Sequence, residues 1–297
     1  MQEGTVRFVA VEILRIPNLR NPVMVIAFSG WNDAGEGATG AIDHLLHAWS
    51  EISPEIDPVL IADVDSEEFY DFQVNRPRVF TDENNARSIT WPTTQIFGLM
   101  LTHLDRDIVV VRGEEPSMRW KTFAQDILDV ADDLEVSMVI TVGSLLADIP
   151  HSRPISVGIT AAHATTADRF NVEFSNYEGA TGILSVIHNE CLGREIDGLA
   201  LWAPVPHYAS SAPSPKVSLS LIHALEDILA IHIPQDELEV ASDAWEKEIN
   251  GLAQEDSDVA DYVKALEESK DAVDIPEVSG DMIAKEFERY LRRKNKD

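Results

Sequence analysis

Short hydrophobic runs alternate along this chain with stretches whose apolar residues recur every three or four positions. The short runs predict β-strands, and the periodic stretches predict helices that pack one face on a sheet. The predicted strands are 7–14, 23–28, 58–64, 96–101, 107–111, 137–142, 156–161 and 199–205, and the main predicted helices are 36–52, 120–134, 180–192 and 218–231. This alternation predicts an α/β fold, in which a three-layer α/β/α core holds a mostly parallel sheet.

Two segments interrupt the alternation and define the predicted domain organisation. Between residues 69 and 91, two short β-prone runs flank a polar turn, which predicts a β-hairpin inserted into the core. Its exposed edge, with Phe80, Ile89 and Trp91, is a candidate subunit contact. After Pro234 the pattern is helical and acidic, with predicted helices at 238–252, 259–269 and 283–291. We therefore expect an α/β core over 1–234 and a helical C-terminal lid over 235–297, with a solvated tail that serves only solubility as the alternative.

Charge and composition exclude several classes of function. The chain has 297 residues and a formal net charge of -29, which repels a phosphate backbone, so nucleic acid is an unfavourable partner. No apolar run reaches the roughly 18 residues that span a bilayer, and the first residues lack the pattern of a signal peptide. We expect a cytoplasmic protein without a membrane partner. The single cysteine, Cys191, excludes a disulfide framework and is interpreted as a buried structural thiol rather than a nucleophile.

A glycine-rich turn between a strand and a helix marks the first candidate pocket. The run 23–28 ends at Ser29-Gly30, and the pentapeptide Glu-Gly-Ala-Thr-Gly at 36–40 follows and recurs at 178–182. A helix that begins after such a turn offers unpaired N–H groups and a positive dipole end to a ligand. Thr39 and Thr181 could then hydrogen-bond a bound anion, or they could serve only as local caps.

Polar clusters follow several predicted strands, and in a parallel sheet the ends of these strands meet at one edge. We expect them to converge on one pocket, where crowding should leave at least one carboxylate with a raised pKa or with a close partner such as Arg153 or His207. The alternative is that they only pin the loops through hydrogen bonds. The candidate ligand-binding residues are Asn32, Asp33, Gly37, Thr39, Glu114, His151, Arg153, Tyr177, Glu178, Gly179 and His207.

Catalytic signatures are weak in this sequence. His207 beside a carboxylate such as Glu114 or Asp33 could act in acid–base chemistry, although a histidine flanked by prolines can also simply cap a turn. Ser144 lacks the second glycine of a nucleophile elbow. There is no P-loop, dinucleotide fingerprint or His-Glu-x-x-His motif, so we predict no cofactor and no metal site and assign no catalytic residue.

Taken together, these motifs resemble the proteasome assembly chaperone 2 family in its actinobacterial form. The matching elements are 28–35 (Phe-Ser-Gly-Trp-Asn-Asp-Ala-Gly), 76–77, 113–116, 150–154, 177–179, 201–203 and 206–208, with 287–291 near the C-terminus. The resemblance implies a core like that of purine nucleoside phosphorylases and related hydrolases, a homotrimer held partly by the inserted hairpin, and a helical lid over a ligand pocket. Relatives help assemble proteasome α-rings, often through a hydrophobic–Tyr–any tail, a motif that the final residues 292–297 do not carry.

Two functional hypotheses follow from the motifs and the resemblance. The first is a non-catalytic assembly or interaction protein that binds other proteins. The alternative is a phosphorylase- or hydrolase-like enzyme or sensor that binds a small anionic or nucleoside-like ligand under the C-terminal lid.

Overall fold

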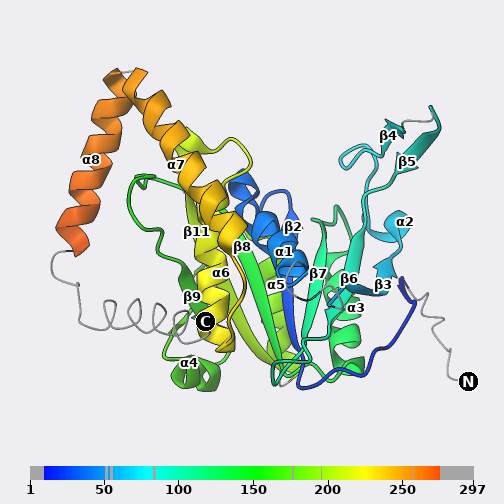
Figure 1. Cartoon of the computed structure of the whole chain (residues 1–297). Coiled ribbons are helices and arrows are strands. Elements are labelled where there is room, and N and C mark those ends of the chain that lie inside the picture. Colours follow the sequence, from blue (N-terminus) through cyan, green and yellow to red (C-terminus); the bar gives the residue numbers. More distant parts are fainter. Residues whose placement is uncertain are drawn as a thin grey trace, which may run out of the picture.

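The central feature of the computed structural model is one nine-stranded sheet with the strand order β1-β3-β6-β7-β2-β8-β11-β9-β10 (Figure 1). The structure describes residues 10–274 except 51, 52, 54, 55, 83, 84, 176, 195 and 256. The strands of this sheet are β1 (Val11–Ile13), β2 (Val23–Ser29), β3 (Val59–Val64), β6 (Thr94–Leu99), β7 (Ile108–Glu114), β8 (Met138–Ala147), β9 (Gly158–Ala161), β10 (Glu173–Phe174) and β11 (Asp197–Pro206). The helices are α1 (Gly37–His47), α2 (Ser66–Phe69), α3 (Trp120–Asp133), α4 (Ala164–Phe170), α5 (Ile183–Glu190), α6 (Pro215–Leu229), α7 (Asp236–Glu255) and α8 (Ser257–Asp274).

The middle of the sheet is parallel and covered on both faces. Strands β7, β2, β8 and β11 pair in parallel, whereas β6 against β7, β3 against β6, β1 against β3 and β9 against β11 are antiparallel. One hydrophobic cluster joins the sheet to α1 and α6, and a second joins the opposite face to α3 and α5. Burial on both faces explains why β2 is almost continuously apolar rather than alternating. The prediction of a three-layer α/β/α core is confirmed.

Some elements differ from those predicted. Helix α4 and the two-residue strand β10 were not expected, because 164–170 carries few apolar residues and a two-residue strand has no periodicity to detect. The predicted helix over 180–192 begins only at Ile183. The predicted strand 7–14 is described only from residue 10, and the predicted helix 283–291 lies outside the described residues.

Two arms project from the edge at which the parallel strands end (Figure 1). The hairpin arm consists of β4 (Arg78–Thr81) and β5 (Arg87–Thr90), which form a separate two-stranded sheet, with the segment 70–77 that leads to them. At its base Phe72 packs edge-to-face on Trp91, with ring centroids 4.8 Å apart. The helical arm consists of α7 and α8, which meet at the tip of the arm and diverge as an inverted V, with α7 packed beside α6. In the described part of the chain, no helix combines the length and hydrophobicity needed to cross a bilayer.

Candidate functional site

Asp33 closes the N-terminus of α1 from inside the protein. Its Oδ1 accepts hydrogen bonds from the backbone N–H groups of Ala38 at 2.9 Å and Thr39 at 3.1 Å, and its Oδ2 accepts one from the Thr39 hydroxyl. Burial raises the pKa of Asp33, while the hydrogen bonds from Thr39 and Ala38 act in the opposite direction. The expectation of a carboxyl group with a raised pKa at this edge is confirmed, although burial rather than crowding is the main cause. Asp33 rather than Thr39 is the local cap, since the Thr39 hydroxyl itself donates to Asp33, and the helix end is filled by the chain's own carboxylate.

The two copies of Glu-Gly-Ala-Thr-Gly adopt different backbone conformations. In the first copy Glu36 is left-handed, with φ of 52°, and α1 begins at Gly37. A Cβ on Gly37 would lie 2.6 Å from Cγ1 of Val217, so this glycine permits α1 to approach α6. The second copy lies before α5 rather than in it, and its Gly179 has a φ of 159°. The repeat is therefore not a shared ligand-binding turn.

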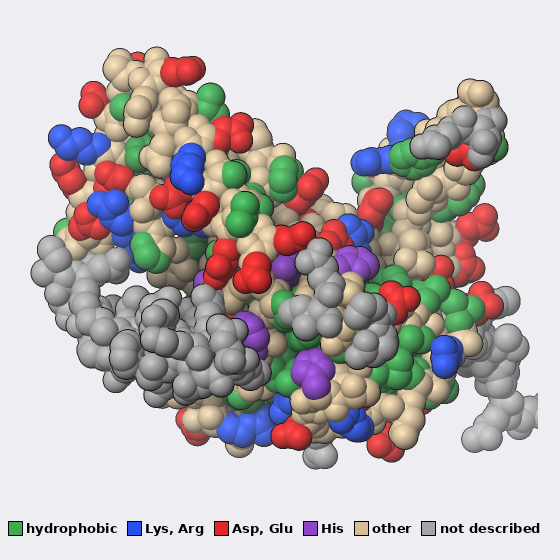
Figure 2. Space-filling model, in the orientation of Figure 1, with side chains coloured by type: hydrophobic (Ala, Val, Ile, Leu, Met, Phe, Trp, Pro, Cys, Tyr) green, Lys and Arg blue, Asp and Glu red, His purple; other side chains and the backbone are tan. Residues whose placement is uncertain are grey.

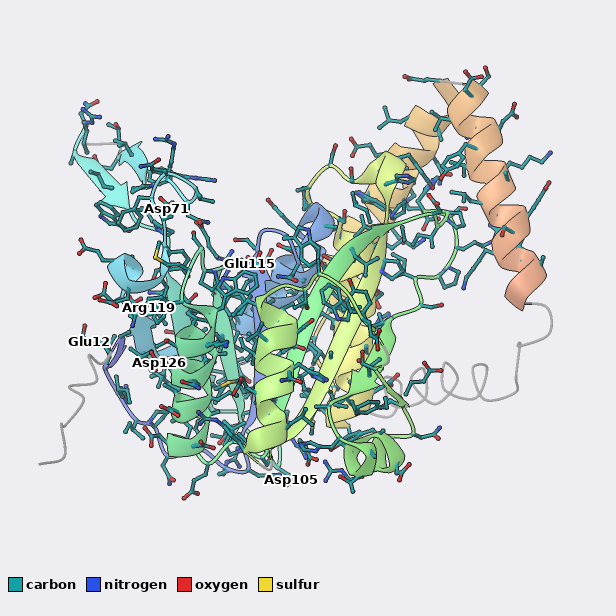
Figure 3. The ribbon with its side chains drawn as sticks, turned by 180° about the vertical axis from the view of Figure 1, so that it is seen from behind. Glu12, Asp71, Asp105, Glu115, Arg119 and Asp126 are labelled. Carbon is teal, nitrogen blue, oxygen red and sulfur yellow. The ribbon has the colours of Figure 1, made fainter. Side chains whose placement is uncertain are left out.

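Glu115 closes the N-terminus of α5 in the same way. It lies in the polar stretch 113–116 that follows a predicted strand, but it was not among the candidate ligand-binding residues. Its Oε1 accepts hydrogen bonds from Nδ2 of Asn32 at 2.7 Å and from the backbone N–H of Ile183 at 3.0 Å. Figure 3 shows Glu115 at the edge of the core where the parallel strands end. The predicted site residue Asn32 is 1% exposed, and its amide packs against Gly182, where a Cβ would lie 2.2 Å from Oδ1. Both helix ends proposed for anions are occupied by internal carboxylates.

Glu114 anchors the base of the hairpin arm. Its Oε2 accepts a hydrogen bond from Nδ2 of Asn75 at 2.8 Å, and Asn75 in turn accepts one from the hydroxyl of Ser117 at 2.6 Å. The Tyr70 hydroxyl donates to the backbone carbonyl of Glu114 at 3.0 Å. These contacts hold the segment 70–77 on the end of β7. Glu114 thus positions the arm, and among the described residues it makes no hydrogen bond or ion pair with His207.

His151 joins the loop after β8 to the helical arm. The backbone N–H of His151 donates to the Tyr208 hydroxyl at 2.8 Å, and that hydroxyl donates to Nδ1, also at 2.8 Å. Because Nδ1 is an acceptor, Nε2 carries the proton and donates to Oδ1 of Asn250 in α7 at 3.2 Å. Lys216 donates to the His151 carbonyl at 2.6 Å and also pairs with Glu246 of α7. His151 is fully buried, and every polar atom of its ring has a partner within the chain.

Stability should fall below about pH 6.5 because His151 is buried in its neutral form. Burial lowers the pKa of His151 below 6.5, more than its hydrogen bond to Asn250 and the nearby Glu246 raise it. Burial likewise lowers the pKa of His44 and of His188. In the unfolded chain these rings take up protons near pH 6.5, so stability is complete above that pH and decreases as the pH falls, by at most about 1.4 kcal/mol per pH unit and group.

Urea denaturation between pH 7.5 and 5 measures this dependence. The slope should be shallower in His151→Gln, which has no titratable group at this position, and unchanged in His103→Gln, which alters an exposed histidine. Equal slopes for wild type and His151→Gln would contradict the burial of a neutral ring.

Arg153 and His207 bind the loop after β8 to α8. The guanidinium of Arg153 makes two hydrogen bonds of 2.8 Å to the carboxylate of Asp271 and a longer contact of 3.4 Å with Glu267. These partners raise the pKa of Arg153, mainly through Asp271. His207 Nδ1 lies 3.3 Å from Oδ1 of Asp148, which also accepts a hydrogen bond from Tyr262 of α8 at 2.9 Å. Of the two basic groups expected beside the predicted site carboxylates, Arg153 faces α8 instead, and His207 faces Asp148 in the loop after β8.

Replacing Arg153 by alanine should loosen α8 without unfolding the core. Amide hydrogen exchange across 257–272 is expected to accelerate, because the bidentate pair with Asp271 is lost, while the melting temperature stays close to that of wild type. Arg119→Ala is the matched control, since it removes an arginine that pairs with Glu68 on α2 at a distance from α8. Unchanged exchange in α8 of the Arg153 variant would show that the pair does not hold the helix.

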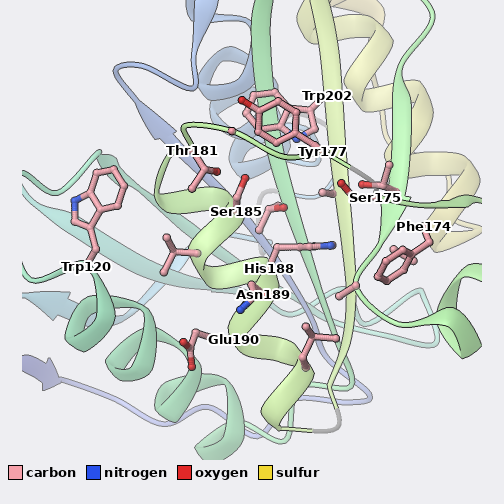
Figure 4. A pocket seen from close by; sticks show the side chains of 18 of the residues that line it. Trp120, Phe174, Ser175, Tyr177, Thr181, Ser185, His188, Asn189, Glu190 and Trp202 are labelled. Atoms are coloured by element: carbon pink, nitrogen blue, oxygen red, sulfur yellow. The ribbon is translucent and has the colours of Figure 1, made fainter.

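Tyr177, Glu178 and Gly179 form the remaining group of predicted residues. The Tyr177 hydroxyl donates to the carbonyl of Ala180 at 2.8 Å, and the side chains of Tyr177 and Glu178 are exposed. A cavity of about 630 Å³ lies beside them, between α5 and the strands β8, β11 and β9 (Figure 4). Tyr177 and Gly179 line it, and so does Thr181, which was expected to hydrogen-bond an anion or to cap its helix; the other predicted site residues do not. The helical arm was expected to cover every site residue. It contacts His151, Arg153 and Asp148, the last through Tyr262. It contributes no residue to the lining of this cavity.

The predicted residues therefore separate into local groups that pin the loops, which is the alternative that the sequence left open. Ser144 lies beside Asp33, because its hydroxyl donates to the carbonyl of the next residue, Ala34, at 2.9 Å. Cys191 is confirmed as a buried thiol, and burial raises its pKa to about 12, far from that of a nucleophile. No three of the described histidine, cysteine and acidic side chains are grouped so that they could hold a metal ion.

Comparison with known proteins gives matches that cover most of the chain. The model of the PAC2 family matches residues 27–253, most of the chain. The chain belongs to the PAC2 family. A PAC2 family protein from Streptomyces avermitilis MA is 42% identical, with a TM-score of 0.74 over 82% of this chain and 99% of that one. A proteasome-assembly chaperone homologue from Mycobacterium tuberculosis is 40% identical, with a TM-score of 0.72 over 81% of this chain and 99% of that one.

The PAC2 fold also extends to distant relatives. PbaB of Pyrococcus furiosus, an archaeal proteasome activator, is 15% identical, with a TM-score of 0.64 over 82% of this chain and 97% of that one. At this identity the likeness concerns the fold alone. A search of curated proteins finds no match.

Proposed function

We propose that this PAC2 chain is a non-catalytic protein that binds other proteins during assembly, with proteasome subunits as its partners. One observation carries the proposal: the polar residues at the strand ends are engaged within the chain, whereas the hairpin arm presents apolar side chains to solvent. Similarity to the mycobacterial proteasome-assembly chaperone homologue supports the choice of partner.

The hairpin arm has the composition of a binding surface. Val79, Phe80 and Ile89 are each more than half exposed, and Trp91 is 47% exposed. Figure 2 shows Lys and Arg side chains beside hydrophobic ones on this arm, while acidic side chains are frequent over the rest of that face. Large exposed apolar groups on a projecting arm favour contact with another protein.

We further propose that the hairpin arm joins copies of the chain into a homotrimer. The positive charge of Arg78 and Arg87 on an arm of a strongly acidic protein favours contact with the acidic surface of a second copy. A trimer presents three copies of the remaining surface at once, which strengthens binding to a partner that carries several equivalent subunits. This contact leaves the helical arm free for such a partner.

Co-purification tests the proposed partner. The tagged chain, expressed together with the α- and β-type proteasome subunits of its own cell, should retain at least one subunit type in a fixed ratio after washing at physiological salt. A tagged chain with Arg153→Ala serves as a folded comparison in which α8 is loosened. Absence of both subunit types from the wild-type eluate would exclude this partner.

A further inference from the structure

Strands β8 and β11 continue past the rest of the sheet and leave an open edge. β2 pairs with β8 only as far as Ile26 and Thr141, and one isolated bridge then joins Asp33 to Ser144. Beyond Ser144, β8 pairs with β11 on one side, and no described strand lies on the other side. We call residues 145–147 on this side the β8 edge. An open strand edge is a template on which another chain can add a strand.

The backbone N–H of Leu146 points to the open side of β8. The N–H of Ser144 donates to the carbonyl of Asn32 at 2.8 Å, on the side of β2. N–H groups alternate in direction along a strand, so the N–H of Leu146, two residues later, faces the same way. The side chain of Leu146 is 53% exposed, and that of Leu145 is 44% exposed. The β8 edge thus combines an outward N–H group with two apolar side chains.

The opposite edge of the same strand pair is closed by prolines. β9 pairs with β11 only over 199–202, and Pro204 and Pro206 follow in β11. Proline has no N–H to donate to a further strand. The β8 edge, with the sequence Leu-Leu-Ala, contains no proline and no charge. Of the two edges, the β8 edge is therefore the one that suits an added strand.

The hairpin arm provides strands that lack cover. Every residue of β4 and β5 is exposed. Val79 lies opposite Ile89 and Phe80 lies opposite Ser88, so apolar side chains face solvent on both faces of the hairpin. An isolated two-stranded sheet is marginally stable in water, and further strands stabilise it. The hairpin and the β8 edge therefore complement each other.

Charge favours the same pairing. The hairpin carries Arg78 and Arg87. Asp148 directly follows the β8 edge, and its side chain is 72% exposed. Arginine on one surface and a carboxylate on the other attract, whereas two hairpins placed together would bring their arginines into repulsion. The charges thus favour contact of the hairpin with the β8 edge over contact with a second hairpin.

From these features we propose that the hairpin arm of one copy pairs with the β8 edge of a second copy and adds its strands to the main sheet there. The two surfaces differ, so the contact is heterologous, and each chain offers one hairpin and one β8 edge. Heterologous contacts close into a ring when the rotation between neighbours permits it, and three copies then give the proposed trimer. This inference rests on the hairpin contact proposed above and not on the proteasome partner.

Two variants that complement each other test the proposal. The hairpin variant is Phe80→Ser with Ile89→Ser. The edge variant is Leu146→Pro, which removes the outward N–H and leaves the pairing with β11 in place. Each variant alone should have the mass of a monomer by light scattering. Mixed in equal amounts, they should form a 1:1 dimer, because the intact hairpin of the edge variant fits the intact β8 edge of the hairpin variant and no second contact is available.

A second edge variant keeps the test valid if the proline disturbs folding. Leu145→Lys with Leu146→Lys retains every N–H group and places positive charge against the arginines of the hairpin, so this chain should also be a monomer. Leu192→Lys with Leu252→Lys is the matched control, because it changes two leucines of similar exposure elsewhere on the chain. The control should keep the mass of the wild-type protein.

The outcomes separate this inference from the proposed trimer. A monomeric hairpin variant together with folded edge variants that stay trimeric would overturn the β8 edge as the acceptor and leave the hairpin contact standing. Two monomeric variants that do not combine when mixed would overturn it as well. A hairpin variant that keeps the wild-type mass, or a wild-type chain that is already monomeric, would overturn the hairpin contact itself and this inference with it.

Discussion

Replacing Asp33 by alanine is expected to lower the free energy of unfolding by about 3 kcal/mol. The change removes the acceptor of four hydrogen bonds, the weakest of them from the Ser144 hydroxyl, and leaves the backbone N–H groups of Ala38 and Thr39 buried without a partner. Loss of these bonds also releases the start of α1, which lies against the middle of the sheet. Chemical denaturation at pH 7 monitored by circular dichroism measures the difference.

Two variants show whether the capping geometry is the cause. Asp33→Asn retains an oxygen that can accept from both backbone N–H groups and no longer buries a charge, so its cost should be only about 1 kcal/mol. Glu36→Ala changes an exposed acidic residue in the adjacent turn and should be close to neutral. If Asp33→Ala were as stable as wild type, the interpretation of Asp33 as the internal cap of α1 would be wrong.

The double substitution Phe80→Ser with Ile89→Ser should convert the proposed trimer into monomers without unfolding the chain. Both side chains are more than half exposed, so their loss removes little from the core but removes the apolar centre of the proposed contact. Light scattering coupled to size-exclusion chromatography gives the mass of each variant. Because multivalency is lost, capture of proteasome subunits should fall by at least about tenfold.

The helical arm provides the matched control for this experiment. Val240 and Leu252 on α7 are also more than half exposed, and Val240→Ser with Leu252→Ser removes a similar apolar area without touching the hairpin arm. This pair should leave the trimer mass unchanged. A hairpin variant that keeps the mass of the wild-type protein, or a wild-type chain that is already monomeric, would contradict the proposed contact.

The layers of the fold were predictable because their signals are local. The apolar run of β2 can be recognised from consecutive residues alone. The same is true of α1, in which helical spacing places Ile42 and Leu45 on one face. The directions of β6 and β9 were not predictable, because only their pairing with β7 and β11 makes them antiparallel. Likewise β10 is a strand only because it pairs with β9, and a stretch of two residues is too short to predict that pairing.

The site was harder to predict because its hydrogen bonds connect distant parts of the chain. Asp33 accepts hydrogen bonds from residues only five and six positions away, but the local cap expected at this helix start was Thr39 rather than Asp33. Glu115, in contrast, binds the N–H of Ile183, 68 positions later, and His151 reaches Asn250 across 99 positions. Strand order brings these groups to the same edge of the sheet, but packing decides which of them meet.

The repeated pentapeptide shows the same limit. Its first copy becomes helical at Gly37, where the missing side chain admits Val217 of α6, whereas Gly182 of the second copy admits the amide of Asn32 just before α5 begins. Identical residues therefore serve two different close approaches. A sequence repeat of this length predicts a glycine-dependent contact in each place but not a common ligand.

Assembly of the proteasome core from purified subunits is the most direct test of the proposed function. The rate and yield of assembled particles are measured by native gel electrophoresis with and without a stoichiometric amount of this chain, with the Phe80→Ser, Ile89→Ser variant as the comparison. We expect the wild-type chain to increase the rate or the yield and the variant to do so much less. Identical assembly with and without the wild-type chain would contradict a role in proteasome assembly.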